Sequence, residues 1–313
     1  MDLPGEESLR WIVSRYAGLL ARHGDGIGTP ELVQPTGDYF PDEFTPTGEG
    51  VARLVARMLS YAPVREGLDV RLRFLEDEGD AGSSSGGCGS APGSGKGSCG
   101  SGGGKSGGCA PGEFDSPRDR VLELDDAYLL EMPAAAVGHP VALTTVLARA
   151  AGSLVLAEAG EEVSPAEQGG MSELCAVACG LGVLVAGGAH VYGKSCGGAR
   201  VTQHTHLTVE EVTVALALFG DLHGLKPGEV RAHLETTQRE AFAEAHDWVA
   251  SNPSIVAQLR SRPEVIEAGM FRVEETKGFF GKLFAKRAAI EDEAAFCYAA
   301  GSSREHAQAG RRR

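Results

Sequence analysis

The feature that most limits how this chain can fold is a long tract of small residues that divides it in two. Between Gly79 and Gly112, 15 of 34 residues are glycine and 8 are serine. Such a segment cannot bury enough apolar surface to offset the conformational entropy lost when it becomes ordered. We therefore expect a disordered, solvated loop, so that the core is built from the residues before and after it.

The tract also holds three of the seven cysteines, Cys88, Cys99 and Cys109, each among glycine, serine and other small residues. Exposed thiols on a flexible tether can capture a soft metal or be chemically modified. Only two lysines lie nearby to lower their pKa values, so a catalytic thiolate is not indicated. A passive linker is the first interpretation, and weak metal or thiol capture is the second.

The remainder of the chain has the composition of a globular protein. Hydrophobic residues make up 42%, while 29 basic against 43 acidic residues give a net charge of −14. A nucleic-acid partner is not expected, because there is no excess of cations to displace phosphate counterions. The first thirty residues carry charges, including Glu6, Glu7 and Arg10, and lack the apolar block of a signal peptide. We predict a cytoplasmic protein, whose cysteines remain thiols or metal ligands.

Before and just after the tract, hydrophobic periodicity predicts helices at Leu9–Leu20 and Gly50–Tyr61 and a half-buried strand at Leu68–Phe74. Shorter strands are expected at Glu31–Gln34 and Arg120–Leu124. The tract would then connect two strands of one small sheet. An insertion there costs little, because loop-closure entropy grows only with the logarithm of length.

After Pro140 the pattern is mainly helical. Helices are predicted over Val141–Ala159, Ser172–Ala186, a segment beginning at Thr208 with a Thr208/Glu211 capping box, and Pro227–Ala250. The predicted fold class is α+β, with a small N-terminal mixed sheet and helices followed by a mostly helical C-terminal part. We divide the chain into an α/β part (1–78), the tract (79–112), a helical part completing the same domain (113–290) and a flexible tail (291–313).

One apolar segment, Leu174–Tyr192, has 19 residues without a formal charge and approaches the length needed to cross a bilayer. Four glycines and a histidine dilute its hydropathy. We interpret it as a helix buried within the protein and followed by a turn at Gly187–Gly188, and we expect no membrane span.

Two stretches resemble zincin-type metallopeptidases of the gluzincin kind, in particular a bacterial group of zinc-peptidase-like proteins. In that family a helix bears His-Glu-x-x-His, and a later helix bears Glu-x-x-x-Asp and runs into Gly-Leu-Gly-Val. Here the first helix contains Leu147-Ala148-Arg149-Ala150-Ala151-Gly152-Ser153. The second contains Gly169-Gly170-Met171-Ser172-Glu173, followed by Gly180-Leu181-Gly182-Val183.

Alignment on these frames places Arg149 and Ser153 at the histidine positions, Ala150 at the general base and Gly169 at the third ligand. Only Glu173 keeps an acidic group, where the family has an aspartate that braces a histidine. The resemblance therefore implies a zincin-like fold whose HExxH motif is lost, a pseudoenzyme that works as a binding or scaffold protein and needs no cofactor. It also implies that Arg149 and Glu173 form an ion pair, within about 6 Å of each other.

A metal- or thiol-binding protein is the alternative function. Cys175 and Cys179 are four residues apart on a predicted helix and so share a face, and Cys196, His204 and His206 are candidate further ligands for zinc or another soft metal. Simple core packing explains the cysteine pair equally, and a polar loop or strand explains the histidines. A hydrolase with another mechanism is the third option, although no serine or cysteine nucleophile with its base is recognisable.

The last candidate is a surface for a protein partner. Phe279, Phe280, Leu283 and Phe284 alternate with lysines and an arginine in a pattern typical of a basic amphipathic helix. Two or three turns of an ordinary core helix have the same pattern.

Overall fold

The computed structural model covers the whole chain and describes residues 3–24, 27, 31–76, 119–195 and 198–274. The glycine-rich tract, its three cysteines, Cys196, the four apolar residues at 279–284 and the tail from residue 291 lie outside the described residues. Within the described part, helices predominate and accompany a small mixed sheet, which confirms the α+β class.

The mixed sheet has three strands, β1 (Val70–Leu75), β2 (Arg120–Glu123) and β3 (Tyr128–Pro133), in the order β1-β3-β2. β1 runs parallel to β3, whereas β2 runs antiparallel to it. The strands expected near residues 68–74 and 120–124 are confirmed, and the tract does connect two strands of one sheet. These two strands are not paired with each other, because β3 lies between them.

The third expected strand, Glu31–Gln34, is wrong: these residues join no sheet. Leu32 and Val33 are nevertheless buried, and the Val33 amide donates to the carbonyl of Gly180 at 3.0 Å. The segment is therefore bonded to the helical turn that contains Gly180 and pairs with no strand of the described residues.

Two of the described helices precede the tract, and another follows the sheet. α1 (Glu6–His23) and α3 (Gly48–Leu59) confirm the first two predicted helices, and the Thr47 side chain caps α3 by accepting from the Gly50 amide. After a short 3-10 helix, η1 (Ala134–Gly138), the long helix α4 (Pro140–Glu158) begins with proline, which fits a first helical turn that needs no amide donor.

The predicted helix at 172–186 is longer and is broken in the middle. It consists of α5 (Gln168–Ala176), a π-helical turn η2 (Val177–Leu181) and α6 (Gly182–Ala189). Gly180 has a φ of 87°, which residues with a Cβ rarely adopt, so the kink is located there. The turn expected at Gly187–Gly188 is wrong, since α6 continues through both glycines.

Two helical stretches in the described part are long and apolar enough to cross a bilayer: Pro140–Glu158 and Gln168–Ala189. Inside the protein, 72% and 94% of their most apolar windows are buried. Their apolar residues are thus in the core, against neighbouring helices.

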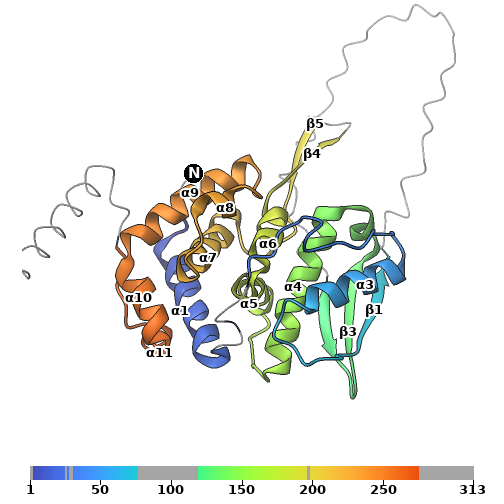
Figure 1. Cartoon of the computed structure of the whole chain (residues 1–313), viewed down its shortest axis with the longest axis horizontal. Coiled ribbons are helices and arrows are strands. Elements are labelled where there is room, and N and C mark those ends of the chain that lie inside the picture. The colour runs from blue at the N-terminus through green and yellow to red at the C-terminus, as the bar shows by residue number, and fades with distance from the viewer. Residues whose placement is uncertain (1–2, 25–26, 28–30, 77–118, 196–197, 275–313) are drawn as a thin grey trace, which may run out of the picture.

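A hairpin and five helices complete the described chain. β4 (Val191–Ser195) and β5 (Gly198–Thr202) pair antiparallel and project from the body in Figure 1. α7 (Val209–Leu222) has the predicted capping box of Thr208 and Glu211. The single helix predicted at 227–250 is two helices, α8 (Pro227–Arg231) and α9 (Thr236–Ser251), followed by α10 (Pro253–Ser261) and α11 (Pro263–Glu267).

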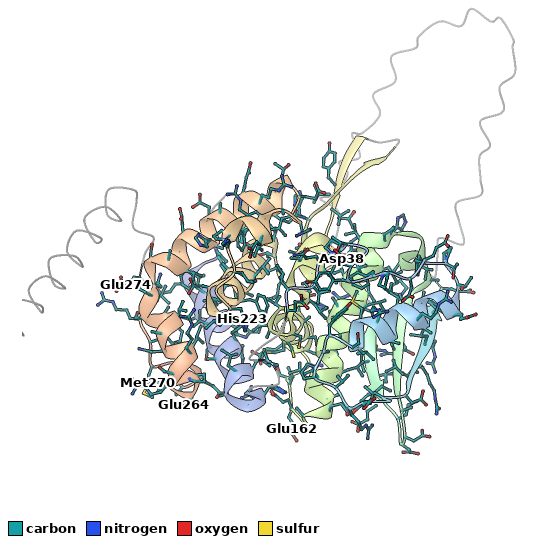
Figure 2. The ribbon with its side chains drawn as sticks, in the orientation of Figure 1. Asp38, Glu162, His223, Glu264, Met270 and Glu274 are labelled. Carbon is teal, nitrogen blue, oxygen red and sulfur yellow. The ribbon has the colours of Figure 1, made fainter. Side chains whose placement is uncertain are left out.

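One hydrophobic core joins these elements, with buried residues from Leu9 to Ile266. In Figure 1, α4, α5 and α6 run through the middle of the molecule, between the sheet with α3 on one side and α1 and α7–α11 on the other. Figure 2 shows Glu162, Glu264 and Met270 projecting at the end opposite the hairpin. The two helices that carry the resemblance to metallopeptidases are therefore central elements.

Candidate functional site

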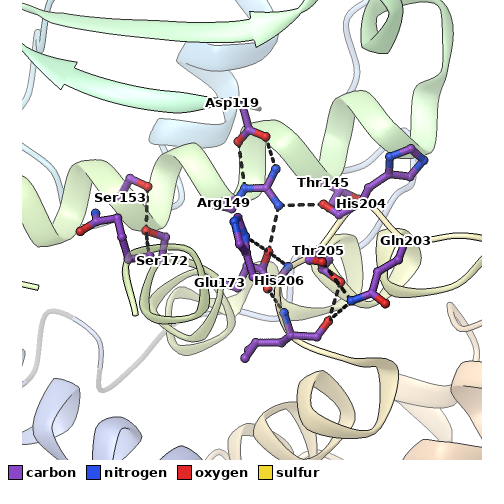
Figure 3. A network of polar contacts seen from close by, with 12 residues as sticks. Asp119, Thr145, Arg149, Ser153, Ser172, Glu173, Gln203, His204, Thr205 and His206 are labelled. Atoms are coloured by element: carbon purple, nitrogen blue, oxygen red, sulfur yellow. Dashed lines mark hydrogen bonds and ion pairs between the residues drawn. The ribbon is translucent and has the colours of Figure 1, made fainter. Parts of the chain in front are cut away.

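A buried arginine is the centre of the candidate site. Arg149, on α4, is 3% exposed, and its guanidinium donates to both carboxylate oxygens of Asp119, the residue just before β2. Its Nη1 donates to Glu173 on α5 at 2.8 Å and to the carbonyl of His204 at 2.7 Å. Figure 3 shows the guanidinium between these three partners, which come from three separate parts of the chain.

The second member, Glu173, is fully buried and also satisfied on all sides. Besides Arg149, it accepts from the backbone amides of His206 at 2.7 Å and Leu207 at 2.8 Å, and the His206 ring nitrogen lies 3.2 Å away. Its carboxylate therefore holds the loop between β5 and α7 in place. The expected ion pair is confirmed, and the two residues are in direct contact.

The electrostatics of Arg149 keep it charged. Burial would lower its pKa, but the adjacent carboxylates of Asp119 and Glu173 outweigh this and raise the pKa above its ordinary value. Burial also lowers the pKa of the His204 imidazole, and the positive charge of Arg149 lowers it further. The cluster thus consists of one permanent cation, its two anionic partners and a nearby imidazole that favours the neutral form.

The two helices touch along a seam of small residues. A Cβ on Gly152 would lie 2.0 Å from the carbonyl oxygen of Ser172, so only glycine allows this approach. Next to it, the Ser153 hydroxyl donates to the Ser172 hydroxyl at 2.8 Å. Ala150 is buried nearby. All five positions singled out by the resemblance lie on the facing helices α4 and α5: 149, 150 and 153 on α4, and 169 and 173 on α5.

The fifth position, Gly169, is in the first turn of α5 and faces the loop after the hairpin. A Cβ there would come within 2.3 Å of the His206 ring atoms. A glutamate at this position, as in the peptidase pattern, would not fit while His206 keeps its place. His206 is held there by Glu173, which accepts from its backbone amide and lies 3.2 Å from its ring nitrogen.

The alternative metal ligands are only partly brought together. Cys175 and Cys179 are fully buried and their thiols hydrogen-bond to each other; this contact and burial raise the pKa of Cys175 well above its ordinary value. The neighbouring phenol of Tyr16 is buried as well, and its pKa is raised by burial and by the two cysteines. Because the thiolate is the form that binds a metal, an incoming metal would have to displace a proton from each buried thiol.

His204 and His206 are not in a strand, as one interpretation required, but in the loop after β5. They join the arginine cluster mainly through their backbone groups. Among residues 3–24, 27, 31–76, 119–195 and 198–274, no group of three histidine, cysteine or acidic side chains is placed to hold a metal. Cys196 is outside these ranges.

Sequence reasoning missed Asp119. It is one of 43 acidic residues, and nothing in its immediate neighbours marks it. The only available signal is indirect: a buried arginine needs compensating carboxylates, and one glutamate leaves part of the guanidinium unpaired. After the tract, the chain comes back to the cluster at Asp119, just before β2, and this carboxylate is the second partner of Arg149.

Beside the cluster lies a hollow of about 360 Å³, outside the ion pair itself. Its lining includes Glu7 and Trp11 of α1, Glu167 and Gly170 at the start of α5, His206, and Glu211 of α7. The Trp11 indole donates to Glu167 at 2.7 Å, and Arg15 donates to both oxygens of the same carboxylate. These bonds lower the pKa of Glu167, and the bond from Trp11 has the largest effect.

Comparison of the chain with protein-family models, with curated proteins and with solved structures found no match.

Proposed function

We propose that this protein is a non-catalytic binding or scaffold protein of the cytoplasm, built on a metallopeptidase-like scaffold that has lost its zinc ligands. The observation that carries the proposal is the pairing of Arg149, which makes four hydrogen bonds to Asp119, Glu173 and the His204 carbonyl; the alignment gives it the position at which the resembled family has a metal-binding histidine. Arginine stays protonated in proteins and has no lone pair to offer a metal.

A peptidase zinc centre does not fit the residues present. Ala150 can neither accept nor donate a proton, so it cannot serve as the general base. Ser153 is hydrogen-bonded to Ser172, and the space beside Gly169 is filled by the His206 ring. Glu173 already receives bonds from Arg149, His206 and Leu207, which leaves it no role as a ligand.

The Arg149 cluster instead holds one wall of the neighbouring hollow in position. Through Glu173, Arg149 is linked to the loop that carries His206, and His206 forms part of the wall of the neighbouring hollow. Fixing that wall in advance reduces the entropy that a ligand must overcome when it binds. A rigid, paired ion cluster behind a solvent-accessible hollow suits a binding protein.

Metal analysis of protein purified without chelators tests this function. We expect zinc, copper and iron each to be well below one equivalent per chain, and we expect no hydrolysis of an unstructured peptide library. One tightly held metal per chain, lost in Cys175→Ser, would favour the alternative metal-binding function and contradict the proposal. Hydrolysis that resists chelators and disappears with one serine or cysteine substitution would contradict it as well.

A further inference from the structure

The hollow beside the arginine cluster has a mixed lining that points to one class of ligand. Three helices contribute to it: α1 through Glu7 and Trp11, α5 through Gly170, and α7 through Glu211. Gly170 lets the indole come close, since a Cβ there would lie 3.1 Å from the Trp11 ring. The result is an aromatic wall with carboxylates at its rim, open to solvent.

The carboxylates of the rim differ in how far they are already neutralised. Glu167 is paired with Arg15. Glu211 uses one oxygen to accept from the Thr208 amide, as part of the capping box, and Glu7 has no ion pair within the described residues. The starts of the three helices add partial positive charges, each about half an elementary charge and screened by water. They offset only part of the full charges on Glu7 and Glu211, so the hollow favours a cation.

From this geometry we propose that the hollow binds an arginine side chain of a partner peptide or protein. A guanidinium is flat, stacks on an indole and can donate to a carboxylate with two parallel bonds. Guanidinium groups of the chain itself already lie nearby: Nη2 of Arg15 donates to both oxygens of Glu167 beside Trp11, and the Arg10 guanidinium lies 5.4 Å from the centre of the Phe271 ring. The inference rests on the proposed binding function and specifies its ligand.

Other ligand classes fit the lining less well. A phosphate or carboxylate would approach Glu7 and Glu211 and be repelled by both. An uncharged apolar group would cover the two carboxylates and remove their bound water without offering a hydrogen bond in return, which is unfavourable in free energy. A cation with a planar apolar face satisfies the indole and the carboxylates together.

The test compares two probes of nearly the same shape, N-acetyl-arginine N-methylamide and its citrulline analogue, in which a neutral urea replaces the guanidinium and a carbonyl oxygen replaces one of its NH2 groups. Binding is followed through the indole N–H signals in a two-dimensional NMR titration, in which Trp11→Phe identifies the signal of Trp11; the chain has one other tryptophan, Trp248, which is buried. We expect the arginine probe to shift the Trp11 signal and to bind about fivefold more tightly than citrulline, a difference typical of one good surface charge pair.

The test variant combines Glu7→Gln with Glu211→Gln, and Glu210→Gln alone is the matched control. Glutamine keeps the capping box of α7, so the double variant should fold normally, as its thermal unfolding will check. Glu210 precedes Glu211 in the same first turn of α7 but does not line the hollow. We expect the double variant to weaken arginine binding about fivefold and the control to leave it unchanged.

Equal binding of citrulline, no shift of the Trp11 signal, or an equal effect of Glu210→Gln would each overturn the arginine site. None of these results depends on metal content or hydrolysis. A metal-free, inactive protein that ignores arginine would therefore refute this inference alone, whereas a metal-loaded or hydrolytic protein would refute the proposed function.

Discussion

At the scale of single residues, the cost of burying Arg149 is offset by pairing on every side. Moving two charges out of water costs desolvation free energy. Their mutual attraction offsets this cost only when the geometry is good and further hydrogen bonds satisfy the remaining donors and acceptors. Asp119, Glu173 and the His204 carbonyl supply those bonds. The arrangement is therefore sensitive to the loss of one partner, because the remaining charges stay buried.

Arg149→Met should show this sensitivity. The substitution leaves Asp119 and Glu173 buried next to each other without a cation, and we expect a loss of about 3–5 kcal/mol in the free energy of unfolding. Urea unfolding followed by circular dichroism measures it. Arg73→Met is the control: Arg73 is 58% exposed, and its partner Glu131 keeps a second arginine, Arg120. A loss at Arg149 no larger than at Arg73 would contradict the central role of the pairing.

The ion pair followed from the resemblance, whose alignment places the two residues on facing helices, whereas hydrophobic periodicity predicted the helices but not which of their faces meet. Asp119 was not predictable, because its contact with Arg149 depends on where the chain returns after the tract, and no periodicity encodes that return. Similarly, the backbone bonds from His206 and Leu207 to Glu173 depend on the path of a loop. Local pattern gave the helix positions, and tertiary placement decided the rest.

At the scale of elements, most helices followed from hydrophobic periodicity, while three features did not. β3 is buried along nearly its whole length, so it lacks the alternation that marked β1. The π-helical turn at Val177–Leu181 lies within an apolar run in which all faces are buried. The break between α8 and α9 leaves Val230 and Leu234 buried, as one continuous helix would also have done.

The close contact between α4 and α5 gives a testable prediction at this scale. Gly152→Ala would bring a Cβ to 2.0 Å from a backbone oxygen of α5, so the helices must separate, and we expect a loss of at least about 2 kcal/mol. Gly187→Ala is the matched control, since its Cβ would meet nothing closer than Val141 at 3.8 Å. That substitution should be neutral or stabilising by up to about 1 kcal/mol. Thermal and urea unfolding of both variants compare them, and equal effects would contradict the close packing.

At the scale of the whole molecule, the geometry of the sheet sets the shortest linker that can join β1 to β2. β1 ends at Leu75 and β2 begins at Arg120, and both ends lie near the same end of β3, opposite Pro133 and Glu131. With strands about 4.8 Å apart, the two ends are separated by about 10 Å across β3. About ten residues can cross this distance, whereas the chain uses the residues from 76 to 119.

Replacing residues 78–117 with about ten glycine and serine residues should therefore leave the fold intact. Two halvings of the loop length reduce the closure entropy by about 1 kcal/mol, so we expect a shortened protein that is slightly more stable in urea. Asp119 is kept, because Arg149 depends on it. The same replacement with Asp119→Asn is the control, and it should lose stability because one carboxylate charge of the cluster is gone. If the short linker alone costs several kcal/mol, the tract contributes contacts to the folded body and is not a passive linker.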